Sequence, residues 1–280
     1  MEKMCVIGAG TMGAGIAQVF AAAGYSVVLL DVNQKGLMAG LAVIQKSLSR
    51  LTEKGKIAQA EAQDIFGRIS ASVSMADCAG SGLAVEAVFE SLAVKREIFA
   101  GLEKILDANA LLATNTSSIS ITEMGKNLAH PGRLVGLHFF NPAPVMKLVE
   151  VICGAHTSPE TLQKALQIAK GIGKEPVQVQ ESPGFVVNRI LIPMINEAVG
   201  VLAEGVASAQ DIDRAMQFGA SHPMGPLALS DLIGNDVVLA IMEVLQKETG
   251  DGKYRPHPLL KKMVRAGYLG KKTKKGFFEY

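Results

Sequence analysis

The chain has 280 residues, which is enough for two domains with a substantial core. A formal net charge of only +2 excludes a strong overall field that would favour nucleic acid or a membrane surface. The sequence also lacks an apolar run of the roughly 20 residues that a membrane-spanning helix needs.

The first part of the chain alternates between short β-branched runs and longer helical patterns. Strands are predicted at 3–8, 27–31, 83–88, 111–114, 134–138, 148–152 and 177–180. Helices are predicted at 13–23, 34–54 and 92–106, and from Ser158 and Pro159 to about residue 171, because serine caps and proline opens a helix. Gly55 follows the second helix in the usual C-terminal position. This alternation predicts a mostly parallel sheet with helices on both faces.

The pattern changes at Glu181-Ser182-Pro183-Gly184, after which we predict no strand. Helical spacing covers 185–204, 208–218, 231–249 and 258–266, and Ser208 with Asp211 forms a capping pair. We therefore predict an α/β fold with a Rossmann-type nucleotide-binding domain at residues 1–183. An all-helical domain is expected at residues 184–280.

The run Gly8-Ala9-Gly10-Thr11-Met12-Gly13 follows the first predicted strand and opens the first predicted helix. Asp31 ends the second strand, at about the 20-residue spacing of a dinucleotide-binding unit. Gly8 would permit the tight turn, Gly10 would let a pyrophosphate approach the backbone, and Gly13 would let the helix pack on the strand.

The acidic residue at the end of the second strand bears on which cofactor binds. Asp31 would accept hydrogen bonds from the adenosine ribose hydroxyls, and a 2′-phosphate at that place would face a carboxylate. NAD is therefore favoured over NADP, although Lys35 lies close enough in sequence to keep NADP open.

A dehydrogenase that oxidises an alcohol needs, beyond the nicotinamide cofactor, a base for the hydroxyl proton. Histidine is the natural choice near neutral pH. His130, His222 and His257 precede prolines, and His156 lies just before a helix cap. His138 instead ends an apolar strand, where active sites of open α/β sheets lie. Position therefore singles out His138, with a purely structural role as the alternative.

Two further polar groups lie on or after predicted strands. The segment Thr114-Asn115-Thr116-Ser117-Ser118 concentrates hydroxyls and an amide, although either serine could instead cap a short helix near residue 120. Glu150 lies inside an apolar strand and either pairs with His138 or faces solvent.

Cysteines contribute little to the expected chemistry. Cys5, Cys78 and Cys153 are scattered, with neither a disulfide framework nor a metal-ligand spacing. The N-terminus shows no signal-peptide pattern. We therefore expect a cytoplasmic protein with no metal.

Four motifs together carry a family resemblance over essentially the whole chain. They are the glycine run with Asp31, the segment 115–118, the segment 138–142 (HFFNP) and the segment 182–189 (SPGFVVNR). In this order and spacing the chain resembles the 3-hydroxyacyl-CoA dehydrogenases, most closely the free-standing bacterial members that act on 3-hydroxybutyryl-CoA. The resemblance implies hydride transfer between a nicotinamide cofactor and C3 of a short-chain (S)-3-hydroxyacyl-CoA or 3-ketoacyl-CoA.

The resemblance also implies residue roles. His138 would be the base for oxidation and the acid for reduction, and Glu150 would be its partner and favour the protonated form. Ser117 would bind the reacting oxygen, and Asn188 would orient the acyl group. The nicotinamide end would be lined by Glu90, Lys95, Asn115 and Asn141, together with Ser117.

The remaining implied contacts concern CoA and the C-terminus. Ser47, Arg50 and Lys54 lie on one face of the helix predicted at 34–54 and would contact CoA, although an ordinary solvated face is the alternative. Lys272 matches a lysine that approaches the cofactor, in a segment where Lys274 and Phe278 replace the usual glycine and tyrosine. Relatives associate through the helical domain, so a homodimer or an assembly of dimers is expected.

Other two-domain dehydrogenases match less well. The 3-hydroxyacid and 6-phosphogluconate type of dehydrogenase uses a catalytic lysine in a K-x-x-N arrangement, which the residues before Asn188 do not provide. Sugar-nucleotide dehydrogenases need a cysteine in the helical region, and no cysteine follows Cys153. A non-catalytic NAD-binding or structural relative is the alternative from another class, and the presence of all four expected catalytic residues disfavours it.

Overall fold

The computed structural model describes residues 2–280. Contacts within the chain divide it into two compact units, unit 1 up to Glu181 and unit 2 from Ser182 to Tyr280. Each unit has its own hydrophobic core.

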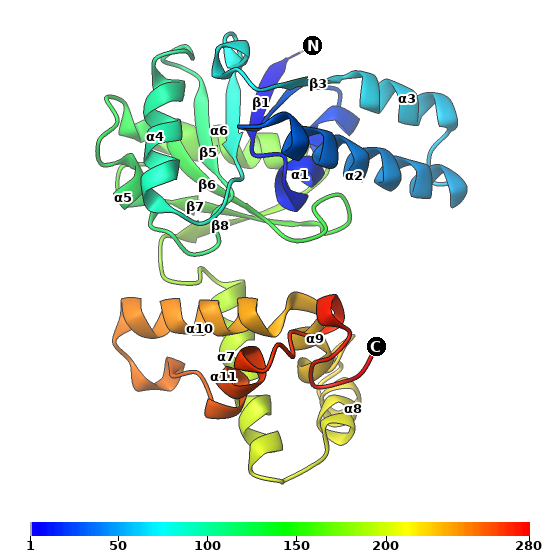
Figure 1. The fold of residues 1–280 in the computed structure, drawn as a ribbon. Coiled ribbons are helices and arrows are strands. Elements are labelled where there is room, and N and C mark those ends of the chain that lie inside the picture. The colour runs from blue at the N-terminus through cyan, green and yellow to red at the C-terminus, as the bar shows by residue number, and fades with distance from the viewer. Residues whose placement is uncertain (1) are drawn as a thin grey trace. The chain divides into compact units, whose positions relative to one another are not determined.

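Unit 1 is built on one eight-stranded sheet in the order β3-β2-β1-β4-β5-β6-β7-β8 (Figure 1). All neighbouring strands are parallel except β6 and β7, which are antiparallel. The mostly parallel sheet predicted from the sequence is therefore confirmed. Its strands are β1 (Lys3–Ile7), β2 (Ser26–Leu30), β3 (Ile69–Ser72), β4 (Leu83–Glu86), β5 (Leu111–Thr114), β6 (Leu134–Phe139), β7 (Leu148–Cys153) and β8 (Glu175–Gln180).

The strand order places a topological switch between β1 and β4. From β1 the chain builds β2 and β3 on one side, and then returns to build β4 and β5 on the other. Connections that leave β1 and β4 therefore run in opposite directions, and open α/β sheets bind their ligands at the carboxyl ends of the strands at such a point. This edge of the sheet is where the candidate site lies.

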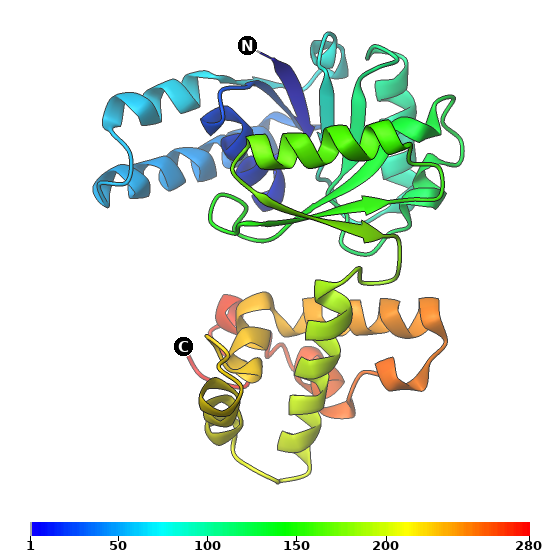
Figure 2. The ribbon, with the colours of Figure 1, turned by 180° about the vertical axis from the view of Figure 1, so that it is seen from behind.

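Helices cover both faces of the sheet. Figure 2 shows α6 lying across one face, and Figure 1 shows α4 on the opposite face. Ser158 caps α6 by accepting a hydrogen bond from the Thr161 amide at 3.2 Å, with Pro159 in the first turn, as the sequence predicted. The helices of unit 1 are α1 (Thr11–Ala22), α2 (Gln34–Glu53), α3 (Gln59–Gly67), α4 (Leu92–Glu103), α5 (Ile121–Gly125) and α6 (Pro159–Gly171).

The sequence did not predict α3 and β3. The strand β3 is at the edge of the sheet, pairs only with β2, and has the sequence Ile-Ser-Ala-Ser, so it shows little of the apolar pattern of a buried strand. Helix α3 is short and buries only Ala62 and Ile65 fully. Both elements depend on packing beside β2 and α1 rather than on a strong local signal.

Unit 2 is helical, as predicted, and its β structure is limited to isolated bridges near the C-terminus. Its core includes Ile195, Leu227 and Met242, each fully buried. Ser208 caps α8 as predicted, because its hydroxyl accepts from the Asp211 amide at 3.2 Å. The helices are α7 (Val187–Ala203), α8 (Ala209–Gly219), α9 (Pro226–Ile233), α10 (Asn235–Thr249) and α11 (Pro258–Arg265).

One predicted helix of unit 2, 231–249, is wrong at its start. Asp231 belongs to α9, and α10 begins only at Asn235. Gly234 separates the two helices with φ of +107°, a conformation that other residues rarely adopt. The apolar spacing runs through this break, so periodicity alone does not reveal it.

Candidate active site

The glycine loop after β1 follows a path that side chains would block. Gly8 has φ of +101°, and a Cβ there would lie 2.7 Å from the Ala87 carbonyl oxygen. A Cβ at Gly13 would lie 1.8 Å from the Gly8 carbonyl oxygen, so α1 packs directly on the loop. At Gly10, by contrast, no heavy atom lies within 4 Å of the Cβ position outside its own chain neighbours. The backbone at Gly10 is therefore open to a ligand.

Asp31 lies immediately after β2, the strand next to β1. Its Oδ2 accepts a hydrogen bond from the Ala9 amide at 2.9 Å, which holds the half-buried carboxylate beside the glycine loop. Helix α1 begins at Thr11, with Met12 in its first turn, so the open amides of the helix N-terminus lie at the same loop. These residues fit a dinucleotide with its pyrophosphate at the helix start and a ribose at the carboxylate.

His138 and Glu150 face each other across the antiparallel strands β6 and β7. The His138 Nδ1 lies 2.8 Å from the Glu150 Oε2, and the two residues are only 6% and 1% exposed. Since Glu150 is buried, the solvent-facing alternative left open by the sequence is wrong. The pairing directs Nδ1 to the carboxylate, which fixes the orientation of the imidazole ring.

The turn after β5 is organised by a carboxylate from the turn after β4. Glu90 accepts hydrogen bonds from the Ser117 amide at 2.7 Å, the Ser117 hydroxyl at 3.2 Å and the Thr116 hydroxyl at 2.9 Å. Helix α5 is capped by Ser120, which accepts from the Glu123 amide at 3.0 Å. The short helix near residue 120 is thus capped by neither Ser117 nor Ser118.

Asn115 connects this turn to the strand that carries His138. Its side-chain Oδ1 accepts a hydrogen bond from the Phe139 backbone amide at 2.8 Å. Its backbone N–H donates to the Glu86 carbonyl oxygen at 2.8 Å. Asn141 lies beyond the end of β6 and is exposed. The structure therefore brings Glu90, Asn115 and Ser117 together at the carboxyl edge of the sheet, beside the residue that follows His138.

The backbone of the loop after Asn141 is held by hydrogen bonds from a buried lysine. The Lys174 Nζ donates to the carbonyl oxygens of Ala143 at 2.6 Å and Met146 at 2.8 Å. Burial lowers the pKa of this ammonium group below its ordinary value. Lys174 thus fixes the backbone on the carboxyl side of Asn141.

The residues expected to contact CoA lie near the C-terminal end of α2. Arg50 and Lys54 are exposed, and Ser47 is half-buried. A cation at each of two successive turns is suited to phosphate groups, since Arg and Lys both bind phosphate oxygens. Their assignment to CoA remains a prediction.

Two expected residues belong to unit 2. Asn188 lies in the first turn of α7 and is half-buried. Lys272 forms an ion pair with Asp236 at the start of α10, with Nζ 2.5 Å from Oδ1. Lys274, where the family commonly has glycine, has φ of +59°, which explains why glycine suits this position.

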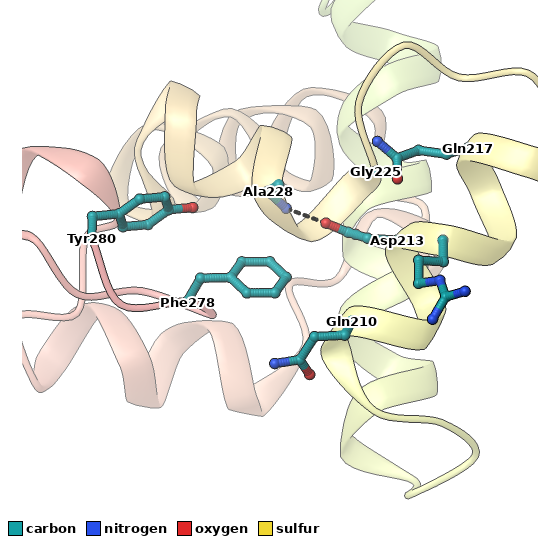
Figure 3. Close-up of a pocket in the computed structure, with 8 residues that line it drawn as sticks. Gln210, Asp213, Gln217, Gly225, Ala228, Phe278 and Tyr280 are labelled. Atoms are coloured by element: carbon teal, nitrogen blue, oxygen red, sulfur yellow. Dashed lines mark hydrogen bonds between the residues drawn. The ribbon is translucent and has the colours of Figure 1, made fainter.

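Unit 2 also contains a cavity of about 440 Å³ (Figure 3). Asp213, at its wall, accepts hydrogen bonds from the amides of Leu227 at 2.8 Å and Ala228 at 2.9 Å, and so holds the N-terminus of α9. The residues around this cavity are Gln210, Asp213, Arg214, Gln217, Gly225, Ala228, Phe278 and Tyr280. The residues that line this cavity include none of the candidate catalytic or cofactor residues.

Family models match the two units in turn. Residues 3–182 match the NAD-binding domain of 3-hydroxyacyl-CoA dehydrogenase, and residues 184–280 match its C-terminal domain. The chain belongs to the 3-hydroxyacyl-CoA dehydrogenase family. The glycine loop and Asp31 therefore lie in an NAD-binding domain.

Individual relatives in this family match over the full chain. The sequence is 52% identical to a 3-hydroxybutyryl-CoA dehydrogenase of Clostridioides difficile, covering 99% of both chains. It is 45% identical to one of Bradyrhizobium diazoefficiens, covering all of this chain and 96% of the relative. The crystal structure of the (S)-3-hydroxybutyryl-CoA dehydrogenase from Ralstonia eutropha superimposes with a TM-score of 0.95 at 46% identity, covering 100% of this chain and 99% of that one.

Glu86 was not predicted from the sequence as a residue of the candidate site. It is the last residue of β4, fully buried, and its carboxylate binds the Lys95 ammonium at 2.7 Å. Lys95 is itself only 1% exposed and lies 3.3 Å from the Glu90 carboxylate. A glutamate inside the predicted strand 83–88, followed nine residues later by a lysine on a helix, was the signal available in the sequence.

Residues 2–280 contain no helix that is both long and apolar enough to cross a membrane.

Proposed function

We propose that the protein catalyses reversible, NAD-dependent hydride transfer between acetoacetyl-CoA and (S)-3-hydroxybutyryl-CoA. The observation that carries the proposal is the buried His138–Glu150 pair at the carboxyl edge of the sheet. The relatives named for this reaction match the chain from end to end. The similar enzyme of Ralstonia eutropha is an (S)-3-hydroxybutyryl-CoA dehydrogenase, which supports the (S) configuration.

The bound nicotinamide supplies or accepts the hydride at C3 of the acyl chain. In reduction, His138 gives a proton to the C3 oxygen, and in oxidation it takes that proton back. Because Nδ1 faces Glu150, the proton is exchanged through Nε2. The Glu150 carboxylate keeps the ring in this orientation and stabilises the imidazolium while the proton is held.

Ser117 supplies the second contact to the reacting oxygen. Its hydroxyl and amide are held by Glu90, so the side chain is oriented before substrate binds. When substrate binds, the hydroxyl would turn its one proton from Glu90 to the C3 oxygen, and a donor at this oxygen is worth about 10²-fold or more in rate. Asn188, from unit 2, is proposed to orient the acyl group.

The cofactor would be NAD, with Gly8, Gly10, Thr11, Met12 and Gly13 at its pyrophosphate. Asp31 would bind the adenosine ribose, and its negative charge would oppose the 2′-phosphate of NADP. The nicotinamide end would be lined by Glu90, Lys95, Asn115, Ser117 and Asn141, with Lys272 nearby.

The division of labour between the domains is part of the proposal. Residues 1–183 would bind NAD, and Ser47, Arg50 and Lys54 on α2 would hold CoA. Residues 184–280 would bind the substrate and form a homodimer or an assembly of dimers. We also propose a cytoplasmic location, in keeping with three cysteines that are all free.

Product analysis tests this function directly. Purified protein is incubated with acetoacetyl-CoA and NADH, the thioester is hydrolysed, and the 3-hydroxybutyrate is resolved by chiral chromatography. We expect the (S) enantiomer alone. Formation of the (R) enantiomer, or of no hydroxy acid, would contradict the proposal. Longer 3-ketoacyl-CoA substrates in parallel measure the preferred chain length.

A further inference from the structure

Glu86 is a buried carboxylate to which no task in the proposed reaction is yet assigned. It ends the central strand β4 and is paired in register with Ile7 of β1 and Thr114 of β5. Its Oε1 accepts from the Lys95 ammonium and the Val88 amide, both at 2.7 Å, and its Oε2 accepts from the Thr114 hydroxyl at 2.7 Å. These three donors compensate for the burial of the Glu86 carboxylate, so the surroundings of Glu86 are built to hold its negative charge.

Lys95 extends this site towards the reacting groups. Its Nζ lies between two carboxylates, 2.7 Å from the Glu86 Oε1 and 3.3 Å from the Glu90 Oε2. Glu90 in turn accepts from both the amide and the hydroxyl of Ser117. One continuous chain of charge-assisted contacts therefore leads from Glu86 to Ser117.

A second, shorter route joins the same two ends. The Thr114 hydroxyl that donates to Glu86 also accepts from the Thr116 amide at 3.2 Å. Thr116 is only 1% exposed, and its hydroxyl donates to Glu90. The turn that carries Ser117 is thus tied to Glu86 through both its backbone and its carboxylate partner.

We propose that Glu86 is a positioning residue for the reduction step, acting through Lys95 and Thr114 on the orientation of Ser117. This inference rests on the proposed function, since it gives a reason for the exact placement of the group that binds the C3 oxygen. Glu86 contacts Lys95, Val88 and Thr114, and need not touch substrate or cofactor.

The charge of Glu86, and not only its shape, is required in this account. With a neutral side chain in its place, the buried Lys95 ammonium retains Glu90 as its one carboxylate partner. The stronger pull of Lys95 on the Glu90 Oε2 would then compete with the Thr116 hydroxyl for that oxygen and draw the Oε1 away from Ser117. Ser117 would lose its fixed orientation while the fold and the glycine loop stay in place.

The test is a double-mutant cycle of Glu86→Gln and Ser117→Ala in the full-length protein, assayed with acetoacetyl-CoA and NADH. We expect Glu86→Gln to lower kcat by about 10-fold to 100-fold, less than the loss of a direct donor, with KM for NADH changed less than about threefold. In the Ser117→Ala background, the same substitution should lower kcat by less than about twofold, because its route of action is already lost.

Glu103→Gln is the matched control. Glu103 also lies in unit 1, is ion-paired with Arg133 and accepts from the amides of Ala129 and His130. We expect its kcat to stay within about twofold of the unmodified protein. If Glu86→Gln fails to fold, Thr114→Val cuts the shorter route alone and should show the same non-additivity with Ser117→Ala.

The outcomes separate this inference from the proposed function. An inactive unmodified protein would overturn both. An active protein whose kcat is insensitive to Glu86→Gln would overturn the inference alone. A kcat insensitive to Ser117→Ala would overturn the inference and the role of Ser117, but not the proposed reaction. Equal losses from Glu86→Gln with and without Ser117 would also overturn it, since they would assign Glu86 a general structural role.

Discussion

At the scale of single residues, the proposed role of His138 depends on the partner of its ring nitrogen Nδ1. A histidine at a strand end is common, but here Glu150 from the neighbouring antiparallel strand holds Nδ1 at 2.8 Å in a buried setting. In the proposed reaction this arrangement would select the tautomer and support positive charge on the ring during proton transfer.

Glu150→Gln keeps the shape of the side chain but removes its charge. We expect kcat to fall by about 10²-fold to 10⁴-fold, because His138 loses the group that fixes its tautomer and stabilises its charged form. The dissociation constant for NADH, measured by fluorescence titration, should change little. A kcat within a few-fold of the unmodified protein would contradict the role of Glu150.

Asp31→Ala tests the choice of cofactor. Removing the carboxylate takes away the expected ribose acceptor, the Ala9 amide contact and the charge that opposes a 2′-phosphate. We expect KM for NADH to rise by about 10-fold, as for one lost hydrogen bond to a charged group, while KM for NADPH falls. An unchanged ratio of the two kcat/KM values would show that Asp31 does not select the cofactor.

The residues of the site differ in how far the sequence could predict them. The glycine loop and Asp31 follow strands directly and His138 lies near the end of β6, so local pattern and position were enough to select them. The pairing of Glu150 depends on the antiparallel register of β6 and β7, which the sequence does not state. Glu86 was missed because the sequence does not show that a glutamate inside the predicted strand 83–88 has three donors around it.

At the scale of elements, buried carboxylates hold unit 2 together. Asp213 of α8 accepts from two amides at the start of α9, and a Cβ at Gly225 would lie 2.1 Å from the Asp213 Cγ. Asp231 of α9 accepts from the amides of Phe277 at 3.0 Å and Phe278 at 2.9 Å. These bonds fix the packing of α9 and of the C-terminal segment.

Asp213→Ala should destabilise unit 2 more than the loss of an exposed cap. It leaves two amides of α9 without their acceptor in a buried place, which costs about 2–3 kcal/mol of unfolding free energy. Ser208→Ala, at the more exposed cap of α8, should cost about 1 kcal/mol. Urea unfolding measures the loss of unfolding free energy in both variants. Equal losses would contradict the role of Asp213 in holding the N-terminus of α9.

The C-terminal tyrosine reports on the same segment. Burial, followed by the charge of Asp231, raises the pKa of the Tyr280 phenol from 10.0 to about 12. Because the folded state holds this proton more tightly, the contribution to stability is complete below pH 10 and is lost as the pH rises through about 12. Ultraviolet titration of the tyrosines should show a component near pH 12 that Tyr280→Phe removes. Titration of that component at pH 10 would contradict the contact with Asp231.

Element boundaries show where local signals fail. Most strands and helices lie within a few residues of their predicted ranges, because each has a clear period or cap. The helix predicted at 231–249 is wrong at its start because its apolar spacing continues across Gly234. Only the backbone conformation, with Asp231 turned towards the C-terminal segment, separates α9 from α10.

At the scale of the whole molecule, the two units carry different parts of the proposed reaction. Unit 1 contains the glycine loop, the Glu86–Lys95–Glu90 chain and the His138–Glu150 pair, whereas unit 2 contributes Asn188 and Lys272. The sequence predicted this division because strand–helix alternation stops at a single proline- and glycine-containing segment. The binding of substrate by residues 184–280 remains part of the proposal.

The most direct test is the rate of NADH absorbance loss with acetoacetyl-CoA, compared between the unmodified protein and His138→Ala. The account predicts turnover by the unmodified protein, at least about 10³-fold slower turnover by His138→Ala, and equal NADH affinity for both. No turnover by unmodified protein that binds NADH, or full activity of His138→Ala, would contradict it.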